Sequence, residues 1–225
     1  GTFTAGSVPG IYGNTVRATV TGLEGFASVE VFDGTAPVVT IDPIPGDLTN
    51  SLTPSITGQA VDDYSTVTEV LFRIAEENAD ITQAEMKQGR LEGTGKDVRF
   101  TLPVSVLQDG KYKVAVQAKN ERELVTDPPV EYAFTIDTTP PAVTISGVEQ
   151  TPSGVSTAGI LDELLDDTLN RANVKVMGQA DDHLTNITRI EAALDGGEWT
   201  NATPEDGTLD TQSESFSVMA EGLAT

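Results

Sequence analysis

Paired aspartates are the residues of this sequence whose type and spacing best suit a chemical task. Calcium takes about 6 to 8 oxygen ligands and tolerates irregular geometry, so acids in loops at domain ends could hold it without a contiguous motif. The candidate calcium ligands are Asp62, Asp63, Asp137, Asp181 and Asp182. The alternative is a solvated acidic loop or a turn cap, because Asp is favoured in turns. The sequence contains no EF-hand loop and no Gly-Gly-x-Gly-x-Asp repeat.

The sequence offers few residues that could carry out catalysis. The sequence has no Cys, and its one histidine, His183, lies in the loop-like stretch "DDHLT", which favours a solvated loop residue. Adjacent acids could be drawn as a glycosidase pair, but 35 acids in 225 residues produce such pairs readily. The stretch "RLEGTGKD" at 90–97 departs from a phosphate loop at its first and last positions, and we interpret it as a Gly-rich hairpin connection. We therefore expect no enzyme activity.

The negative charge of the chain limits the classes of partner that it can be expected to bind. Its formal net charge of -22 repels phosphate backbones and anionic lipid headgroups, so nucleic acid is not an expected partner. The longest apolar runs are far shorter than the roughly 20 residues needed to cross a bilayer, so direct membrane insertion is not expected either. The first residue is Gly1, which suggests a mature or clipped form.

A repeat indicates how the elements that hold these acids are organised. The stretches "DGTAPVVTI" and "DTTPPAVTI" begin 104 residues apart, at 33 and 137, close to the roughly 100 residues of an immunoglobulin-type sandwich. "GQAVDDYSTVTEVLFRI" at 58–74 then resembles "GQADDHLTNITRIEAAL" at 178–194. The sequence therefore predicts two copies of one unit, each with an acidic pair at the same place.

Periodicity predicts mostly strands. In "DGKYKVAVQAKN" the residues Tyr112, Val114, Val116 and Ala118 share one face, as in a half-buried antiparallel strand. Prolines 37, 140 and 141 mark joints, since Pro cannot donate to a strand ladder.

Two short helices are also expected. One is an amphipathic insertion near 158–172, with apolar residues at helical spacing: Ile160, Leu161, Leu164, Leu165 and Leu169. The other lies at 82–88, where Thr82 and Glu85 have capping-box spacing.

The order of these motifs resembles bacterial immunoglobulin-like repeats. The series runs from D-x-T-x-P-x-V-T-I through G-x-A-x-D-D to a D-G-G-x-W hairpin around Trp199, with a D-G-x-Y strand around Tyr112. Such repeats occur in tandem in surface-layer proteins, adhesins and other large exported proteins. The resemblance implies an all-β fold of tandem immunoglobulin-like β-sandwich modules joined by short Pro-containing linkers, with a small helical insertion in the last module.

Three segments follow from this resemblance. Residues 1–33 are expected to be the C-terminal strands of a preceding module, and residues 34–137 a complete module. Residues 138–225 are expected to form a module that carries the insertion and lacks its final strands.

The expected function is that of a structural or spacing module in an extracellular cell-surface assembly such as a surface layer, stalk or fibre, with calcium as a possible stiffening ion. Its partners would be neighbouring modules or copies of the same protein. One alternative is an adhesin segment that binds a glycan or protein ligand. For that role Trp199 could serve as a sugar platform, although packing against its sheet is the expected state of a tryptophan. A second alternative is an ancillary domain of a larger secreted hydrolase.

Overall fold

The structure, a computed structural model, describes residues 8–151, 173–193 and 196–220. Regular structure in these ranges consists of β-strands and two three-residue 3-10 turns, which confirms the all-β fold class. No helix in the described ranges has the length and apolar character to cross a membrane. Contacts between Cα atoms divide the chain into two units, residues 1–136 and 137–225, and each unit is described here by itself.

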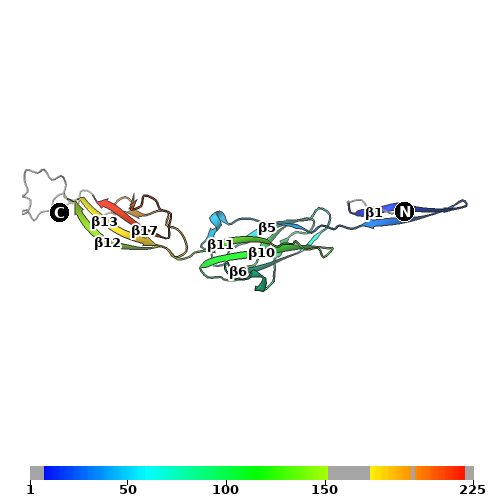
Figure 1. Cartoon of the computed structure of the whole chain (residues 1–225), viewed down its shortest axis with the longest axis horizontal. Helices are drawn as coiled ribbons and strands as arrows, with labels where there is room; N and C mark the ends of the chain where they lie inside the picture. Colours follow the sequence, from blue (N-terminus) through cyan, green and yellow to red (C-terminus); the bar gives the residue numbers. More distant parts are fainter. Residues whose placement is uncertain (1–7, 152–172, 194–195, 221–225) are drawn as a thin grey trace, which may run out of the picture. The chain divides into compact units, whose positions relative to one another are not determined.

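Unit 1 begins with a two-stranded antiparallel hairpin, drawn in blue in Figure 1. It consists of β1 (Gly10–Val20) and β2 (Leu23–Val31). The two strands are joined by a two-residue turn that contains Gly22 with a φ of 81°, a backbone conformation that glycine adopts without steric cost.

Two sheets pack face to face in the rest of unit 1. The first has the order β3 (Val38–Ile41), β5 (Ile56–Val61), β9 (Asp97–Leu102) and β8 (Arg90–Glu92). The second has the order β4 (Leu48–Thr49), β11 (Val130–Ile136), β10 (Gly110–Asn120), β6 (Val67–Glu76) and β7 (Lys87–Gln88). Figure 1 shows β10 between β11 and β6. β4 pairs with β11 in parallel, and the other pairings are antiparallel.

Alternation along the strands explains why these residues form a sandwich. In β10 the predicted inward residues are buried, while Lys111 is exposed and Lys113 and Gln117 are half-buried. Side chains from both sheets meet in one core, whose largest fully buried members are Phe72, Phe100, Ile56, Leu102 and Ile136. The sequence-based interpretation of β10 as a half-buried antiparallel strand is confirmed.

Unit 2 contains a four-stranded antiparallel sheet and a small separate pair of strands. The sheet has the order β12 (Ala142–Thr151), β13 (Asn173–Asp181), β17 (Ser213–Ala220) and β16 (Thr203–Pro204). The pair is β14 (Glu191–Ala192) with β15 (Thr200–Asn201). Among the described residues of this unit, the buried apolar cluster consists of Ala180, Ile187, Ile190, Ala202 and Phe216.

The predicted joint and hairpin are present. β11 ends at Ile136 and β12 begins at Ala142, so residues 137–141 lie outside the strands. Within the stretch 90–97, residues 90–92 are strand β8 and residues 93–96 form the turn of the hairpin β8–β9, with Gly93 at a φ of 97°.

The two predicted helices have different outcomes. The insertion near 158–172 lies outside the described residues. The helix at 82–88 is wrong: the structure has a single 3-10 turn (Ile81–Gln83), and Asp80, not Thr82, caps it by accepting a 3.0 Å hydrogen bond from Thr82 N. The chain then turns extended at Ala84, and Lys87–Gln88 pair with β6, because the strand partner supplies hydrogen bonds that a short helix could not.

Candidate functional site

The acidic residues at one end of each unit form hydrogen-bonded turn networks. In unit 1 the central acid is Asp33, which is buried. Its Oδ1 accepts hydrogen bonds from Thr35 N (2.9 Å) and Thr35 Oγ1 (2.6 Å), and its Oδ2 accepts one from Ser65 Oγ (2.6 Å). Asp33 therefore fastens the entry to β3 to the loop between β5 and β6.

Asp62 continues this network from the other side of the same loop. Its Oδ1 accepts hydrogen bonds from Tyr64 N (3.0 Å) and Ser65 N (2.7 Å). Its Oδ2 accepts one from Asn120 Nδ2 (2.9 Å), and Asn120 lies fully buried at the end of β10. Asn120 Nδ2 also donates to the Thr35 carbonyl (3.1 Å), which closes the network between both sheets.

The hydrogen bonds set the ionisation of Asp33. Burial by itself raises its pKa, but the hydrogen bonds donated by Ser65 and Thr35 outweigh burial and lower the pKa to about 2. Asp33 is therefore ionised at neutral pH, and these hydrogen-bond donors stabilise its charge.

Unit 2 repeats the arrangement at matching positions. Asp137 Oδ1 accepts a hydrogen bond from Thr139 N (3.1 Å), and its Oδ2 accepts one from Thr185 Oγ1 (2.8 Å). Asp182 Oδ1 accepts from Leu184 N (2.9 Å) and Thr185 N (2.8 Å). These backbone hydrogen bonds hold the pKa of Asp182 below its usual value.

The other two predicted ligands lie beside these networks. Asp63 is exposed, and its backbone carbonyl accepts a hydrogen bond from Lys96 Nζ (3.1 Å). Asp181 is half-buried, and its Oδ1 accepts hydrogen bonds from Ser213 Oγ (2.6 Å) and Gln179 Nε2 (3.0 Å).

Asp62 and Asp182 act as turn caps, which is the alternative interpretation of the acidic pairs. Within the described ranges, no group of three or more His, Cys, Asp or Glu side chains is placed to hold a metal ion. Calcium binding stays a prediction.

Sequence reasoning did not single out Asp33 and Asn120 of the acidic networks, nor the separate buried acid Glu214. Asp33 carried a signal, because the repeat equates its stretch with that of Asp137. Asn120 also carried one, because it continues the inward alternation of β10 as a polar residue. Glu214 is buried, and its Oε1 accepts hydrogen bonds from Asp210 N (2.9 Å) and Thr211 N (2.6 Å). No sequence motif predicts this local loop geometry.

Two predictions about single side chains have opposite outcomes. His183 is exposed in the loop after β13, as expected of a solvated loop residue. Trp199 is 69% exposed, so the expected packing against its sheet is wrong. It lies directly before the two-residue strand β15, which offers too little surface to bury an indole ring.

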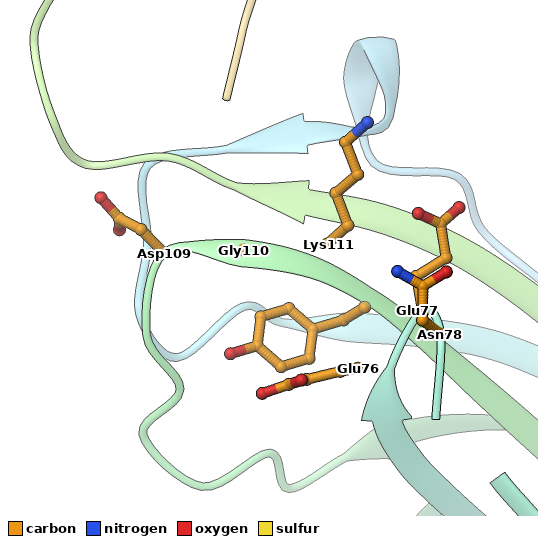
Figure 2. A pocket seen from close by; sticks show the side chains of 7 residues that line it. Glu76, Glu77, Asn78, Asp109, Gly110 and Lys111 are labelled. Carbon is orange, nitrogen blue, oxygen red and sulfur yellow. The ribbon is translucent and has the colours of Figure 1, made fainter. Parts of the chain in front are cut away.

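Unit 1 also has a polar pocket of about 350 Å³ where β6 ends and β10 begins (Figure 2). Its wall includes Glu76, Glu77, Asp109 and Lys111. The side chains of Asp109 and Glu77 project from well-separated places, and Lys111 points away from Glu76.

Comparison with models of known protein families finds no match, and comparison with curated proteins finds no similar sequence.

Proposed function

We propose that this chain is a non-enzymatic structural or spacing segment of an extracellular cell-surface assembly, built from tandem immunoglobulin-like modules joined by short Pro-containing linkers. The observation that carries the proposal is the repeated turn network. Asp33 with Ser65 fastens the segment before β3 to the loop after β5, and Asp137 with Thr185 fastens the segment before β12 to the loop after β13 in the same way. A device repeated at the start of each unit suits a row of similar modules.

The strand order of unit 1 supports the module type. Taken in chain order as A, B, C, C′, D, E, F and G, the strands β3, β5, β6, β7, β8, β9, β10 and β11 give sheets of order A-B-E-D and G-F-C-C′. The short strand β4, which pairs with β11 at the edge of the second sheet, is left out of this lettering. The order of the other strands supports an immunoglobulin-type sandwich. Tyr112 supports it further, because its hydroxyl accepts a hydrogen bond from Gln108 N (3.3 Å), as expected of a tyrosine at the start of strand F.

Unit 2 supports a second module of the same kind. Its sheet β12-β13-β17-β16 also has the order A-B-E-D. The proposed boundaries are those of the sequence analysis moved by one residue, to 33–136 and 137–225, because Asp33 and Asp137 are each bonded to the module that follows them. Location outside the cell follows from the resemblance to exported repeats.

Antibodies raised against the 225-residue chain test the proposal on cells of the source organism. We expect them to label intact cells and to lose their signal after brief protease treatment of the cell surface. Labelling that appears only after permeabilisation would contradict the proposal. A cytoplasmic protein of known location serves as the control for cell integrity.

The exposure of Trp199 favours a second candidate function, the binding of a glycan or protein ligand. An exposed indole face can stack on a sugar ring. Trp199 is the one tryptophan of the sequence, so its fluorescence reports on that position alone. Titration with a glycan library should change its emission if it is a binding platform, and Trp199→Ala should abolish the binding of any glycan detected. No change with any glycan would leave the spacing role as the better account.

A further inference from the structure

Arg122 connects the hairpin β1–β2 to the sandwich that follows it in unit 1. It lies in the turn after β10, and its Cζ lies over the ring of Phe32, 4.5 Å from the ring centroid. Its Nη2 is 3.7 Å from Glu30 Oε1. Glu30 belongs to β2, and Phe32 is one residue beyond the end of that strand. Arg122 therefore contacts both the hairpin and the first residue of the segment 32–37 that leads to β3.

The turn that carries Arg122 is held by Asn120, which is fully buried. Asn120 Oδ1 accepts hydrogen bonds from Arg122 N (3.0 Å) and Leu124 N (3.1 Å). Asn120 Nδ2 donates to the Thr35 carbonyl and to Asp62 Oδ2, so this amide makes all four hydrogen bonds of which it is capable. Asn120 therefore fixes the backbone beneath Arg122 to the sandwich and to the segment 32–37 together.

A second hydrogen bond anchors the same turn. Glu121 N donates to the Thr66 carbonyl at 2.8 Å, and Thr66 lies in the loop between β5 and β6. The position of the Arg122 side chain is thus set by two neighbouring residues that are each bonded to other parts of the sandwich.

The two contacts of Arg122 act in the same direction. Glu30 and Phe32 are two positions apart in an extended chain, so their side chains lie on the same side of it. A planar guanidinium can stack on an aromatic ring and pair with a carboxylate at the same time, which a lysine ammonium does less well. A hairpin that bent away from the sandwich would lose both contacts at once.

We infer that Arg122 holds the hairpin β1–β2 at one angle to the sandwich and limits bending at the segment 32–37. The inference rests on the proposed function, in which the hairpin forms the last strands of a preceding module. It adds the residue that sets the stiffness of the connection between two modules.

Distance measurements by double electron–electron resonance on the 225-residue chain test this role. The sequence has no Cys, so Thr19→Cys in β1 and Glu131→Cys in β11, both at exposed positions, provide two unique sites for spin labels. We expect one narrow distance distribution when Arg122 is present. Arg122→Gln should raise the ratio of displaced to docked hairpins at least about threefold, because it removes an exposed cation–π contact and an exposed ion pair.

Variants on the hairpin side separate the two contacts. Phe32→Leu removes the aromatic ring and Glu30→Gln removes the carboxylate, so each should broaden the distribution less than Arg122→Gln does. Arg90→Gln is the matched control, because Arg90 is exposed on β8 and the substitution changes the charge by the same amount. It should leave the distribution unchanged.

Three outcomes would overturn the inference: a distribution that is already broad in the chain with Arg122, no change with Arg122→Gln, or equal broadening with Arg90→Gln. The side chain of Arg122 is 44% exposed, so Arg122→Gln should leave the urea midpoint of the sandwich unchanged. If that midpoint falls, Phe32→Leu decides, because Phe32 lies outside the strands of the sandwich. None of these results bears on cell-surface location, which the antibody experiment tests separately.

Discussion

The hydroxyl of Ser65 donates a 2.6 Å hydrogen bond to Asp33 Oδ2, and both side chains are buried. The two residues are 32 positions apart, one before β3 and the other between β5 and β6. The hydrogen bond therefore connects the segment before β3 to the loop between β5 and β6. Asp137 and Thr185 make the same bond in unit 2 at 2.8 Å.

Asp62 and Asp63 offer a direct comparison of a structural acid with a solvated one. Asp62→Ala leaves buried donors on Ser65 and Asn120 without an acceptor, and each such loss costs about 1–3 kcal/mol. We expect unit 1 to lose about 3 kcal/mol of unfolding free energy, measured by urea denaturation. Asp63→Ala, one residue away and exposed, should change stability by less than about 0.5 kcal/mol. Equal effects of the two substitutions would contradict the turn network.

The lowered pKa of Asp33 predicts a particular response to acid. Its folded pKa of about 2 lies below the unfolded value near 3.9, so its ionised form stabilises the fold above about pH 4. That contribution is lost as the pH falls toward 2. The difference in unfolding free energy between wild type and Asp33→Asn should therefore narrow between pH 4 and pH 2, because Asn cannot ionise. A difference that stays constant over this range would argue against an ionised Asp33.

Gly58 and Gly178 are predicted to be intolerant of any side chain. A Cβ at Gly58 would lie 2.3 Å from the Phe100 ring and 2.3 Å from the Thr40 carbonyl oxygen. At Gly178 the corresponding distances are 2.5 Å to Phe216 and 2.6 Å to Thr144. Overpacking of this kind costs about 1–3 kcal/mol or more.

The measurement is the thermal midpoint of the 225-residue chain. Gly58→Ala and Gly178→Ala should each lower it by several degrees. Gly34→Ala is the control, because its Cβ meets no atom within 4 Å. An unchanged midpoint for Gly58→Ala would show that the close packing of Phe100 on this glycine is not needed.

The calcium prediction is tested by thermal melts in calcium chloride and in sodium chloride of equal ionic strength. An ion that binds only the folded protein adds about 2.7 kcal/mol at a hundredfold excess over its Kd, which corresponds to a rise of several degrees. The double variant Asp63→Asn with Asp181→Asn should remove that rise. If the calcium and sodium melts coincide, these acids serve the turns and the solvated surface alone.

The sequence by itself determined the local elements. The alternation of Tyr112, Val114 and Val116 specified a strand with one buried face, because side chains alternate across a strand whatever its partners are. Gly93 specified a hairpin turn, because glycine adopts backbone conformations that other residues avoid. The prolines near 140 specified a joint, because proline restricts the backbone and cannot donate to a strand ladder. The helix at 82–88 failed because tertiary strand pairing outweighed a capping signal worth about 1 kcal/mol.

The tertiary structure alone decided which side chains meet. Ser65 reaches Asp33, and Asn120 reaches Asp62 across 58 positions, because two sheets bring distant loops to the same end of the sandwich. It also decided that Val39 is covered and Val143 is exposed, although both occupy the same place in the same motif. A side chain on a strand is buried only if a second sheet lies over it. The sequence of the strand determines which face is apolar, but it does not determine whether another sheet covers that face.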